Sequence, residues 1–237
     1  MVRVRADNPS PLTLDGTNTY VVDRWVVDPG PDDSRHLEAV LRSAGSNGIE
    51  GIVLTHGHHD HDEGAGSLAE RAGGVPVIRP RGDEEVGPFR TVPTPGHSPD
   101  HVSLLRGGAC FTGDTVLGEG SVFVGGGEGS MTAYLDSLRR LRALNPEVLC
   151  PGHGPFVWDP AAKLDEYIEH RLERERKIVE ALDTGLRDPD EILERAWSDT
   201  DLRAHPLLRE AARLTMEAHL EKLREEGRLP PGLRSQR

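Results

Sequence analysis

A run of seven residues that combines four histidines with one aspartate constrains this chain more than any other feature. Residues 55–61, Thr-His-Gly-His-His-Asp-His, follow directly after residues 51–54, Gly-Ile-Val-Leu. The latter run is short, apolar and bounded by a glycine and a charged segment, which is typical of a buried strand. The cluster therefore lies where a strand ends, and loops there commonly carry chemistry because the sheet holds them in place. Imidazole and carboxylate groups bind Zn²⁺ and similar divalent ions.

The spacing within this run favours two neighbouring metal ions over one. In an extended chain His56, His58 and Asp60 share one face, so a turn near Gly57 is needed to send Asp60 and His61 elsewhere. Dividing the ligands between two sites satisfies that geometry better than a single site. A histidine-rich loop exposed to solvent is the alternative. A carboxylate placed among the histidines, directly after a core strand, argues against it.

Three later segments repeat one theme, in which a strand or loop ends in a glycine beside a potential ligand. They are residues 94–97 (Thr-Pro-Gly-His), 111–114 (Phe-Thr-Gly-Asp) and 150–154 (Cys-Pro-Gly-His-Gly). Each glycine permits a sharp turn and a close approach of the backbone to an ion. One such segment alone is weak evidence, because a histidine or aspartate after a glycine is usually a turn residue. Four ligand-bearing segments in order along one chain indicate a shared site.

Charge and hydropathy limit the partners that the chain can have. The 237 residues include 40 acidic and 28 basic side chains, which gives a formal net charge of −12. A broad nucleic-acid-binding face driven by net charge is therefore not expected, although a local basic groove stays open. No stretch approaches a membrane span or a signal peptide, so we expect a soluble, cytoplasmic protein with no membrane partner. Cys110 and Cys150 both end apolar runs and are expected to be buried rather than disulfide-bonded.

The order of elements predicts two sheets packed face to face and covered by helices outside. Strands are expected at 2–5, 19–22, 25–27, 51–54 and 75–78, and then at 89–92, 102–105, 109–112 and 147–150. Helices are expected at 34–44, 64–72 and 131–143. Residues 80–88 are polar and predict a loop, and the glycine-rich residues 118–129 predict a mobile or tightly turning loop at the active site.

The character of the chain changes near residue 160. Helices are expected at 161–182, 190–197 and 206–226, and residues 227–231 are consistent with one short strand or wing. The expected apolar core of these helices is Trp197, Leu207, Leu208, Leu214, Met216, Leu220 and Leu223. The sequence therefore predicts two domains, a catalytic domain at 1–160 and a small helical, winged-helix-like domain at 161–237.

These motifs resemble the metallo-β-lactamase superfamily. Its signature His-x-His-x-Asp-His matches residues 56–61, and its later ligands match His97, Asp114 and His153. Several further segments look like the branch named after lactamase-beta-like protein two, whose members also end in a small winged-helix domain. Those segments are residues 8–11 with 16–20, 94–97, 113–118 and 151–155. The resemblance covers nearly the whole chain.

The resemblance implies an α+β fold, an αββα sandwich, with a dinuclear site for two Zn²⁺ or other divalent ions at one edge of the sheets. By position, one metal would be held by His56, His58 and His97, the second by Asp60, His61 and His153, with Asp114 bridging them. A bridging aspartate is closer to glyoxalase II and to the nuclease branches than to β-lactamases with a cysteine ligand. Cys110 is displaced from that position, which counts against β-lactamase activity.

Some residues near the signature depart from the family pattern, and others are candidates to support the ligands. Asp62 and Glu63 stand where many members have small residues, and two extra carboxylates there would alter metal affinity or repel an anionic substrate. His59 occupies a variable position and is expected to be exposed or to support the ligands. Thr55 and Thr112 precede ligands and are candidates for hydrogen bonds to them, although ordinary strand threonines are more common.

The implied mechanism uses a hydroxide that bridges two metals as the nucleophile. Asp60 is expected to orient this hydroxide and accept its proton, and Asp114 to fix the separation of the metals. In the helix at 161–182, the spacing places Tyr167 and His170 on one face, and a His-Arg pair recurs here in the resembled branch. The resemblance therefore implies that Tyr167, His170 and Arg171 contact the substrate. A charged helix face that seals the interface between the two domains is the alternative.

Three functions compete at this level. Resemblance to the branch with a winged-helix tail implies cleavage of phosphodiester bonds in single-stranded RNA. Glyoxalase II-like and acyl-carrier thioesterase-like relatives share the same ligands, so a thioester or lactone is the alternative substrate, and the acidic charge counts against RNA. A non-catalytic nucleic-acid-binding module is disfavoured by the complete ligand set and by a tail without a basic recognition helix. Neither the choice between RNA and a small acyl substrate nor the oligomeric state follows from the sequence.

Overall fold

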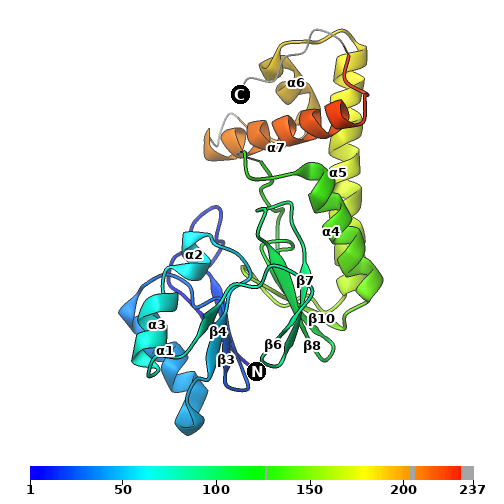
Figure 1. Cartoon of the computed structure of the whole chain (residues 1–237). Helices are drawn as coiled ribbons and strands as arrows, with labels where there is room; N and C mark the ends of the chain where they lie inside the picture. The colour runs from blue at the N-terminus through cyan, green and yellow to red at the C-terminus, as the bar shows by residue number, and fades with distance from the viewer. Residues whose placement is uncertain (126, 203–205, 231–237) are drawn as a thin grey trace.

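The computed structural model describes residues 1–125, 127–202 and 206–230 of the chain. They form two five-stranded sheets packed face to face, with helices on both outer faces. In Figure 1, α1, α2 and α3 cover one side of the sandwich, α4 and α5 cover the other, and α6 and α7 lie beyond its end. The predicted α+β fold, an αββα sandwich, is confirmed.

The first sheet carries the strand that precedes the histidine run. Its strands, in spatial order, are β1 (Val2–Arg5), β2 (Asn18–Val22), β3 (Trp25–Val27), β4 (Gly51–Val53) and β5 (Val77–Ile78). The pairs β3–β4 and β4–β5 are parallel. Parallel neighbours need crossover connections, and helices α1 (Ser34–Ala44), α2 (His59–Asp62) and α3 (Ala65–Arg71) supply them. Every residue of β4 is buried, as its continuous apolar run predicts.

The second sheet carries the later ligand-bearing segments. Its order is β10 (Val148–Pro151), β9 (Ala109–Gly113), β8 (Val102–Arg106), β7 (Phe89–Pro93) and β6 (Glu85–Val86). The pair β9–β10 is parallel and is joined through helix α4 (Met131–Leu144). Strand β6 lies inside residues 80–88, which were predicted to be a loop. That prediction was wrong because this edge strand is only two residues long and exists through its pairing with β7.

Alternating side chains divide the apolar residues into three layers. Val53, Phe89 and Phe111 lie between the sheets, whereas Ile52 and Leu54 face α1 and α3. The layer between the second sheet and helices α4 and α5 contains Cys110, Leu135, Leu138, Leu149 and Leu164. Cys110 and Cys150 are both buried and free, which confirms that they act as small apolar side chains.

Side-chain caps determine where the principal helices begin. Asp33 accepts a hydrogen bond from the His36 N–H at 2.9 Å before α1, and Ser130 accepts one from the Ala133 N–H at 3.2 Å before α4. Asp159 does the same for the Ala162 N–H at 3.0 Å before α5. Each cap satisfies a backbone donor that has no partner within the helix.

The C-terminal part contains the three predicted helices, α5 (Pro160–Asp183), α6 (Pro189–Ala196) and α7 (Pro206–Glu225). The first part of α5 packs on the sandwich, and its second part forms a separate apolar cluster with α6 and α7. Trp197, Met216, Leu220 and Leu223 lie in this cluster as predicted. None of the described helices is both long and apolar enough to cross a membrane.

Two details of this region differ from the sequence-based prediction. Leu207 and Leu208 are 72% and 45% exposed, so their assignment to the core was wrong. They lie in the first turn of α7. Leu207 is on the face opposite Met216, whereas Leu208 lines a cavity beside Ala212. Residues 227–230 contain no strand, and residue 231 lies outside the described residues. The wing and the boundary at residue 160 stay predictions.

A buried ion cluster ties α5 to the end of α7. The Glu175 side chain is 6% exposed, and its carboxylate lies 2.8 Å from Lys222 Nζ and 2.7 Å from Arg228 NH1. Burial raises the pKa of Glu175, but its contacts with His219, Lys222 and Arg228 outweigh burial and lower this pKa to about 2. The ionised form of Glu175 is therefore favoured more in the folded chain than in the unfolded chain.

Replacing Glu175 by Gln should lower the free energy of unfolding by about 2 kcal/mol at pH 7, because Lys222 stays buried and keeps only Glu226 as an acidic partner. In the wild type the contribution of Glu175 is present above its usual pKa of 4.5 and is lost as pH falls toward about 2. The variant should therefore lose this part of the acid sensitivity. Denaturant unfolding from pH 7 to pH 3 measures both effects. A Glu175→Gln variant no less stable than the exposed control Glu38→Gln would contradict this account.

Candidate metal centre

The two sheets bring all seven predicted ligands together at one edge. His56 and His58 follow β4, and Asp60 and His61 lie on the short helix α2 that comes next. The remaining three follow strands of the second sheet: His97 comes after β7, Asp114 after β9 and His153 after β10. The parallel arrangement of β9 and β10 places the last two at the same edge.

These side chains form two groups, divided as the resemblance implies. The first group is His56, His58, His97 and Asp114, and the second is Asp60, His61 and His153. Within each group, the atoms that could bind an ion all lie within 4.8 Å of one another. The chain changes direction between the two groups at helix α2, and not at the turn that was predicted near Gly57. His58 is extended, with φ −72° and ψ 142°, and the helix that starts at His59 sends Asp60 and His61 to the second group.

The carboxylate of Asp114 stands between the two groups. Its Oδ1 lies 3.3 Å from the Nε2 atoms of both His61 and His153, and its Oδ2 lies 3.6 Å from His97 Nε2. Asp114 is only 9% exposed, and Oδ1 has no hydrogen-bond partner among the described residues. A buried, unpartnered carboxylate oxygen is costly. A cation bound in either group would give this oxygen a partner.

Ring nitrogens face one another inside each group. His58 Nδ1 lies 3.1 Å from His56 Nε2 and 3.0 Å from His97 Nε2, and His61 Nε2 lies 3.3 Å from His153 Nε2. Converging imidazole nitrogens beside carboxylate oxygens are the donor set that Zn²⁺ and related divalent ions take in proteins. The residues therefore fit a pair of such ions.

The opposite ring nitrogens are held by hydrogen bonds that leave Nε2 free to bind a metal. His97 Nδ1–H donates to the Phe123 carbonyl at 2.9 Å, and His153 Nδ1–H donates to the Gly16 carbonyl at 3.3 Å. His56 Nδ1 lies 3.0 Å from Thr55 Oγ1, as anticipated for that threonine. Thr112 instead donates to the Val116 carbonyl and supports no ligand.

Asp28 is a supporting residue that sequence patterns mark only as part of a turn. It is 2% exposed and accepts hydrogen bonds from the Thr55 N–H at 2.8 Å and the Thr55 hydroxyl at 2.7 Å. It also accepts one from His61 Nδ1–H at 2.9 Å. A carboxylate behind a ligating histidine fixes the orientation of the ring and increases its basicity. Asp28 therefore orients His61 toward the second group.

His101 is a second residue that sequence reasoning missed. Its Nε2 accepts a hydrogen bond from the Asp114 N–H at 3.1 Å, and its Nδ1 lies 3.0 Å from Thr94 Oγ1. The ring stacks on His56 with centroids 4.8 Å apart. Burial, followed by the nearby His97, lowers the pKa of His101 well below its usual value, which keeps the ring neutral. His101 thus holds the backbone of Asp114 without binding an ion itself.

Electrostatics keep the acidic groups of the site ionised. Burial raises the pKa of Asp114, but His61 and His153 outweigh it and hold that pKa well below its usual value. Burial lowers the pKa of His61, whereas Asp114 and Asp28 raise it well above its usual value. The pKa of His153 rises to about 9 because the attraction of Asp114 outweighs burial. The negative charge of Asp114 that raises the pKa of these two rings would also attract a metal cation.

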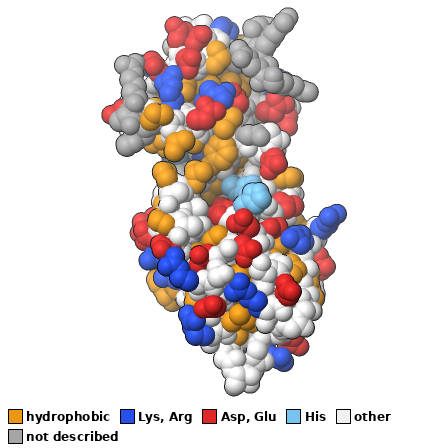
Figure 2. Space-filling view, turned by 90° about the vertical axis from the view of Figure 1, so that its left-hand side faces the viewer, with side chains coloured by type: hydrophobic (Ala, Val, Ile, Leu, Met, Phe, Trp, Pro, Cys, Tyr) orange, Lys and Arg blue, Asp and Glu red, His pale blue; other side chains and the backbone are white. Residues whose placement is uncertain are grey.

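A cavity of about 230 Å³ opens onto the ligands. Ser10, Leu12 and Thr13 lie on one side of it, and Val122 and Phe123 on another. Figure 2 shows histidine side chains reaching the surface near the middle of one face, with acidic side chains gathered beside them. Both groups contribute to the lining through His58, Asp60, His97, Asp114 and His153.

The two extra carboxylates after the signature do not line this cavity. Asp62 pairs with Arg79 at 3.0 Å, and Glu63 is exposed, with one carboxylate oxygen 3.4 Å from the Asp32 backbone nitrogen. His59 is exposed, as expected for its variable position.

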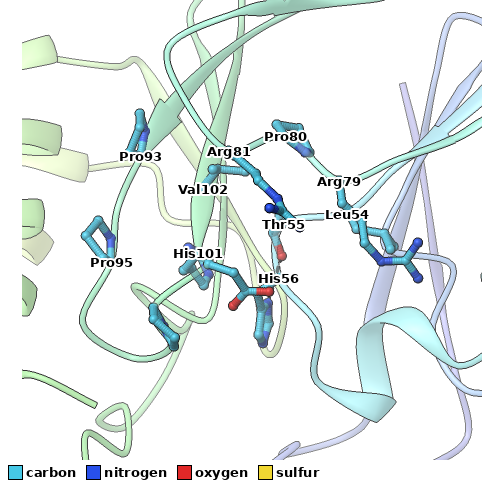
Figure 3. Close-up of a pocket in the computed structure, with 12 residues that line it drawn as sticks. Leu54, Thr55, His56, Arg79, Pro80, Arg81, Pro93, Pro95, His101 and Val102 are labelled. Carbon is cyan, nitrogen blue, oxygen red and sulfur yellow. Dashed lines mark hydrogen bonds between the residues drawn. The ribbon is translucent and has the colours of Figure 1, made fainter. Parts of the chain in front are cut away.

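A larger cavity of about 520 Å³ reaches the site from another direction. Figure 3 shows Pro93 and Pro95 on one side and Arg79 and Pro80 on the other. His56 is the one predicted ligand among its described lining residues.

Two of the predicted substrate contacts make their hydrogen bonds within the protein. The Tyr167 hydroxyl donates to the Gly120 carbonyl at 2.9 Å and accepts from the Leu117 N–H at 3.2 Å. Arg171 donates to Ser121 Oγ at 2.8 Å and to the Val122 carbonyl. Both side chains hold the loop at 117–123, whose Phe123 carbonyl in turn holds His97. Contact of Tyr167, His170 or Arg171 with a substrate stays a prediction.

An αββα sandwich with two histidine and aspartate groups at its edge defines a class of metal-dependent hydrolase. The chain belongs to the metallo-β-lactamase superfamily, whose sequence profile matches residues 12–91 and 76–153. It is 32% identical to the beta-lactamase-like protein 2 homolog of Drosophila melanogaster, over 97% of this chain and 89% of that protein. The resemblance inferred from the motifs is therefore confirmed.

Two further relatives bear on the chemistry. The chain is 32% identical to the atrochrysone carboxyl ACP thioesterase of Aspergillus fumigatus, over 79% of this chain and 66% of that protein. A solved protein in a di-iron-bound form is 28% identical, with a TM-score of 0.57, and the match covers 72% of this chain and 98% of that one.

Replacing Asp28 by Asn should weaken metal binding at the second group by about 10- to 100-fold, because one amide oxygen cannot accept all three hydrogen bonds. The first group should change little. Titration of the metal-free chain against a coloured chelator gives both affinities. The control is Asp23→Asn, which removes an exposed carboxylate that pairs with Arg106. Equal affinities in the two variants would show that Asp28 does not orient His61.

Proposed function

We propose that this chain is a hydrolase that uses two divalent metal ions, with zinc as the metal that best matches its donors. His56, His58 and His97 would hold one ion, and Asp60, His61 and His153 the other, with Asp114 shared between them. The observation that carries the proposal is the position of Asp114, whose two oxygens face different groups. The similar solved protein in a di-iron-bound form supports two ions rather than one.

Two ions bound this way supply Lewis acidity and lower the pKa of water enough to provide a nucleophile near neutral pH. The chain supplies the rest. Asp114 fixes the relation between the two groups, and His101 holds its backbone. The side chain of Asp60 is 30% exposed, compared with 13% for Asp114, and it lines the cavity. We therefore assign to Asp60 the role of orienting the nucleophile and accepting its proton.

The substrate that we propose is single-stranded RNA, cleaved at a phosphodiester bond. The motif resemblance to the branch of lactamase-beta-like protein two implies this activity, and paired metal ions are common in nucleases. A helical, winged-helix-like domain at 161–237 belongs to the same proposal. The apolar cluster shared by α5, α6 and α7 supports its helical part. A cytoplasmic location is proposed with it.

A thioester or lactone is the second candidate substrate. The relative in Aspergillus fumigatus is named as an acyl-carrier thioesterase and matches most of this chain. The net charge of −12 also disfavours a long polyanion at a broad surface. Both candidates use the same ligands, so a substrate assay has to separate them.

Asp114→Ala should lose metal from both groups and lower hydrolysis of any substrate by more than about 100-fold, because loss of an outer partner already costs roughly 10- to 100-fold. Elemental analysis gives the metal content, and the same samples are assayed for turnover. Asp136→Ala, which removes an exposed carboxylate on α4, is the matched control. Two metals per chain in Asp114→Ala would contradict the shared position.

A direct assay compares a fluorescent single-stranded RNA with a glutathione thioester, before and after removal of metal by a chelator. We expect RNA cleavage that disappears with the metal and returns when zinc is added. Thioester cleavage alone would assign the chain to the acyl hydrolases. Cleavage of either substrate that persists after complete metal removal would refute the proposed chemistry.

A further inference from the structure

A second cavity of about 230 Å³ lies between α5, α7 and the loop after β9. Val122 lines both this cavity and the one that opens onto the metal ligands, so the two are neighbours. The described lining of this second cavity contains three nitrogen-rich side chains, His170, Arg171 and Arg174, and no carboxylate. In a chain with a net charge of −12, such a cavity is unusual.

Arg171 is a buried cation without a counter-charge. It is 3% exposed, and its guanidinium donates to Ser121 Oγ and to the Val122 carbonyl and lies over the ring of Tyr134. No carboxylate within the described residues pairs with it, and its Nε–H has no hydrogen-bond partner there. Carbonyl and hydroxyl oxygens compensate a buried charge only in part.

Arg174 adds to this excess of positive charge. It is 6% exposed, pairs with Asp199 at 2.9 Å and lies over the Trp197 ring. Asp199 is shared with Lys177, whose Nζ lies 2.7 Å away, so one carboxylate faces two cations. The Nε–H of Arg174 also has no partner in the described structure.

Other charged groups near the cavity do not remove the excess. Glu175, which follows Arg174 on α5, pairs with Lys222 and Arg228. His219 is fully buried beside Glu175. Around the cavity, Thr200 and Thr215 contribute hydroxyl groups, and Ala211 on α7 leaves space. Guanidinium groups with nearby hydroxyls are the donors that proteins use for phosphate oxygens.

We propose that this cavity binds a phosphate group of the substrate beside the metal centre. The phosphate belongs either to the RNA strand next to the scissile bond or to the phosphopantetheine arm of an acyl thioester. The source of the phosphate rests on the proposed function, whereas the binding of an oxyanion does not. In this subsite Arg174 joins the predicted substrate contacts His170 and Arg171, and all three would contact the same phosphate group.

The test adds a charge to the cavity without touching the arginines. Ala211 is partly buried and lines the cavity from α7, so Ala211→Glu places a carboxylate beside it and Ala211→Gln places a neutral group of the same size. Inorganic phosphate is titrated by calorimetry into the metal-free full chain. Ala211→Glu should weaken phosphate binding at least about 10-fold relative to Ala211→Gln, because like charges repel strongly in a desolvated site. Thermal unfolding of both variants verifies that they are folded.

Two results would overturn the proposal. One is a wild-type chain that does not bind phosphate at about 10 mM. The other is equal binding by Ala211→Glu and Ala211→Gln, which would place the anion elsewhere, for example at the protonated histidines of the metal-free centre. Tungstate soaked into crystals of the full chain gives an independent reading. Its anomalous peak should lie in this cavity, and a peak only at His61 and His153 counts against the subsite.

The source of the phosphate is determined by repeating the comparison with a short oligouridylate and with coenzyme A. Whichever of the two probes resembles the natural substrate should bind more weakly to Ala211→Glu than to the wild type, and should bind Ala211→Gln as the wild type does. Loss for neither ligand would contradict a substrate role for the cavity. Phosphate binding in a chain that cleaves neither RNA nor a thioester would refute the proposed function and leave the subsite intact.

Discussion

The position of one carboxylate between two sets of imidazoles is the constraint on which the rest of this structure depends. Asp114 has to reach His61 and His153 with one oxygen and His97 with the other, while its side chain is only 13% exposed. That approach leaves no room for a side chain at Gly152, whose Cβ would lie 2.7 Å from Asp114 Oδ1 and 2.6 Å from the ring of His61. A buried carboxylate held this way needs nearby positive charge, which protons or metal ions supply.

Support for this centre comes from residues that bind no ion. Asp28 and His101 hold His61 and the Asp114 backbone, and the Phe123 carbonyl holds His97. Through Val122, the loop that carries Phe123 is bound to Arg171 on α5. The C-terminal helices are thus connected to a ligand of the first group by consecutive hydrogen bonds. Arg171 also lines the cavity between α5 and α7. One residue would therefore both anchor the loop and bind an anion.

Sequence patterns that act over a few residues predicted most of this fold. Features that depend on contacts between distant residues were not predicted. The strand at 51–54 and the glycine-histidine and glycine-aspartate segments are visible because periodicity and turn chemistry act over a few residues. In the sequence Asp28 looks like a turn residue, and only the pairing of β3 with β4 brings it beside Thr55. His101 was not predicted because no glycine lies next to it in the sequence. Strand β6 forms only by pairing with β7, and Leu207 is exposed because it lies on the face of α7 opposite Met216. Long-range packing decides each of these cases.

The shared position of Asp114 is tested most directly by X-ray absorption at the zinc edge, on the full chain loaded with two equivalents of zinc. The account predicts nitrogen and oxygen neighbours at about 2.0 to 2.2 Å, together with a zinc–zinc vector at about 3.5 to 4 Å. A spectrum with the same first coordination sphere and no zinc–zinc vector would show that the two groups act separately. In that case Asp114 would not link them.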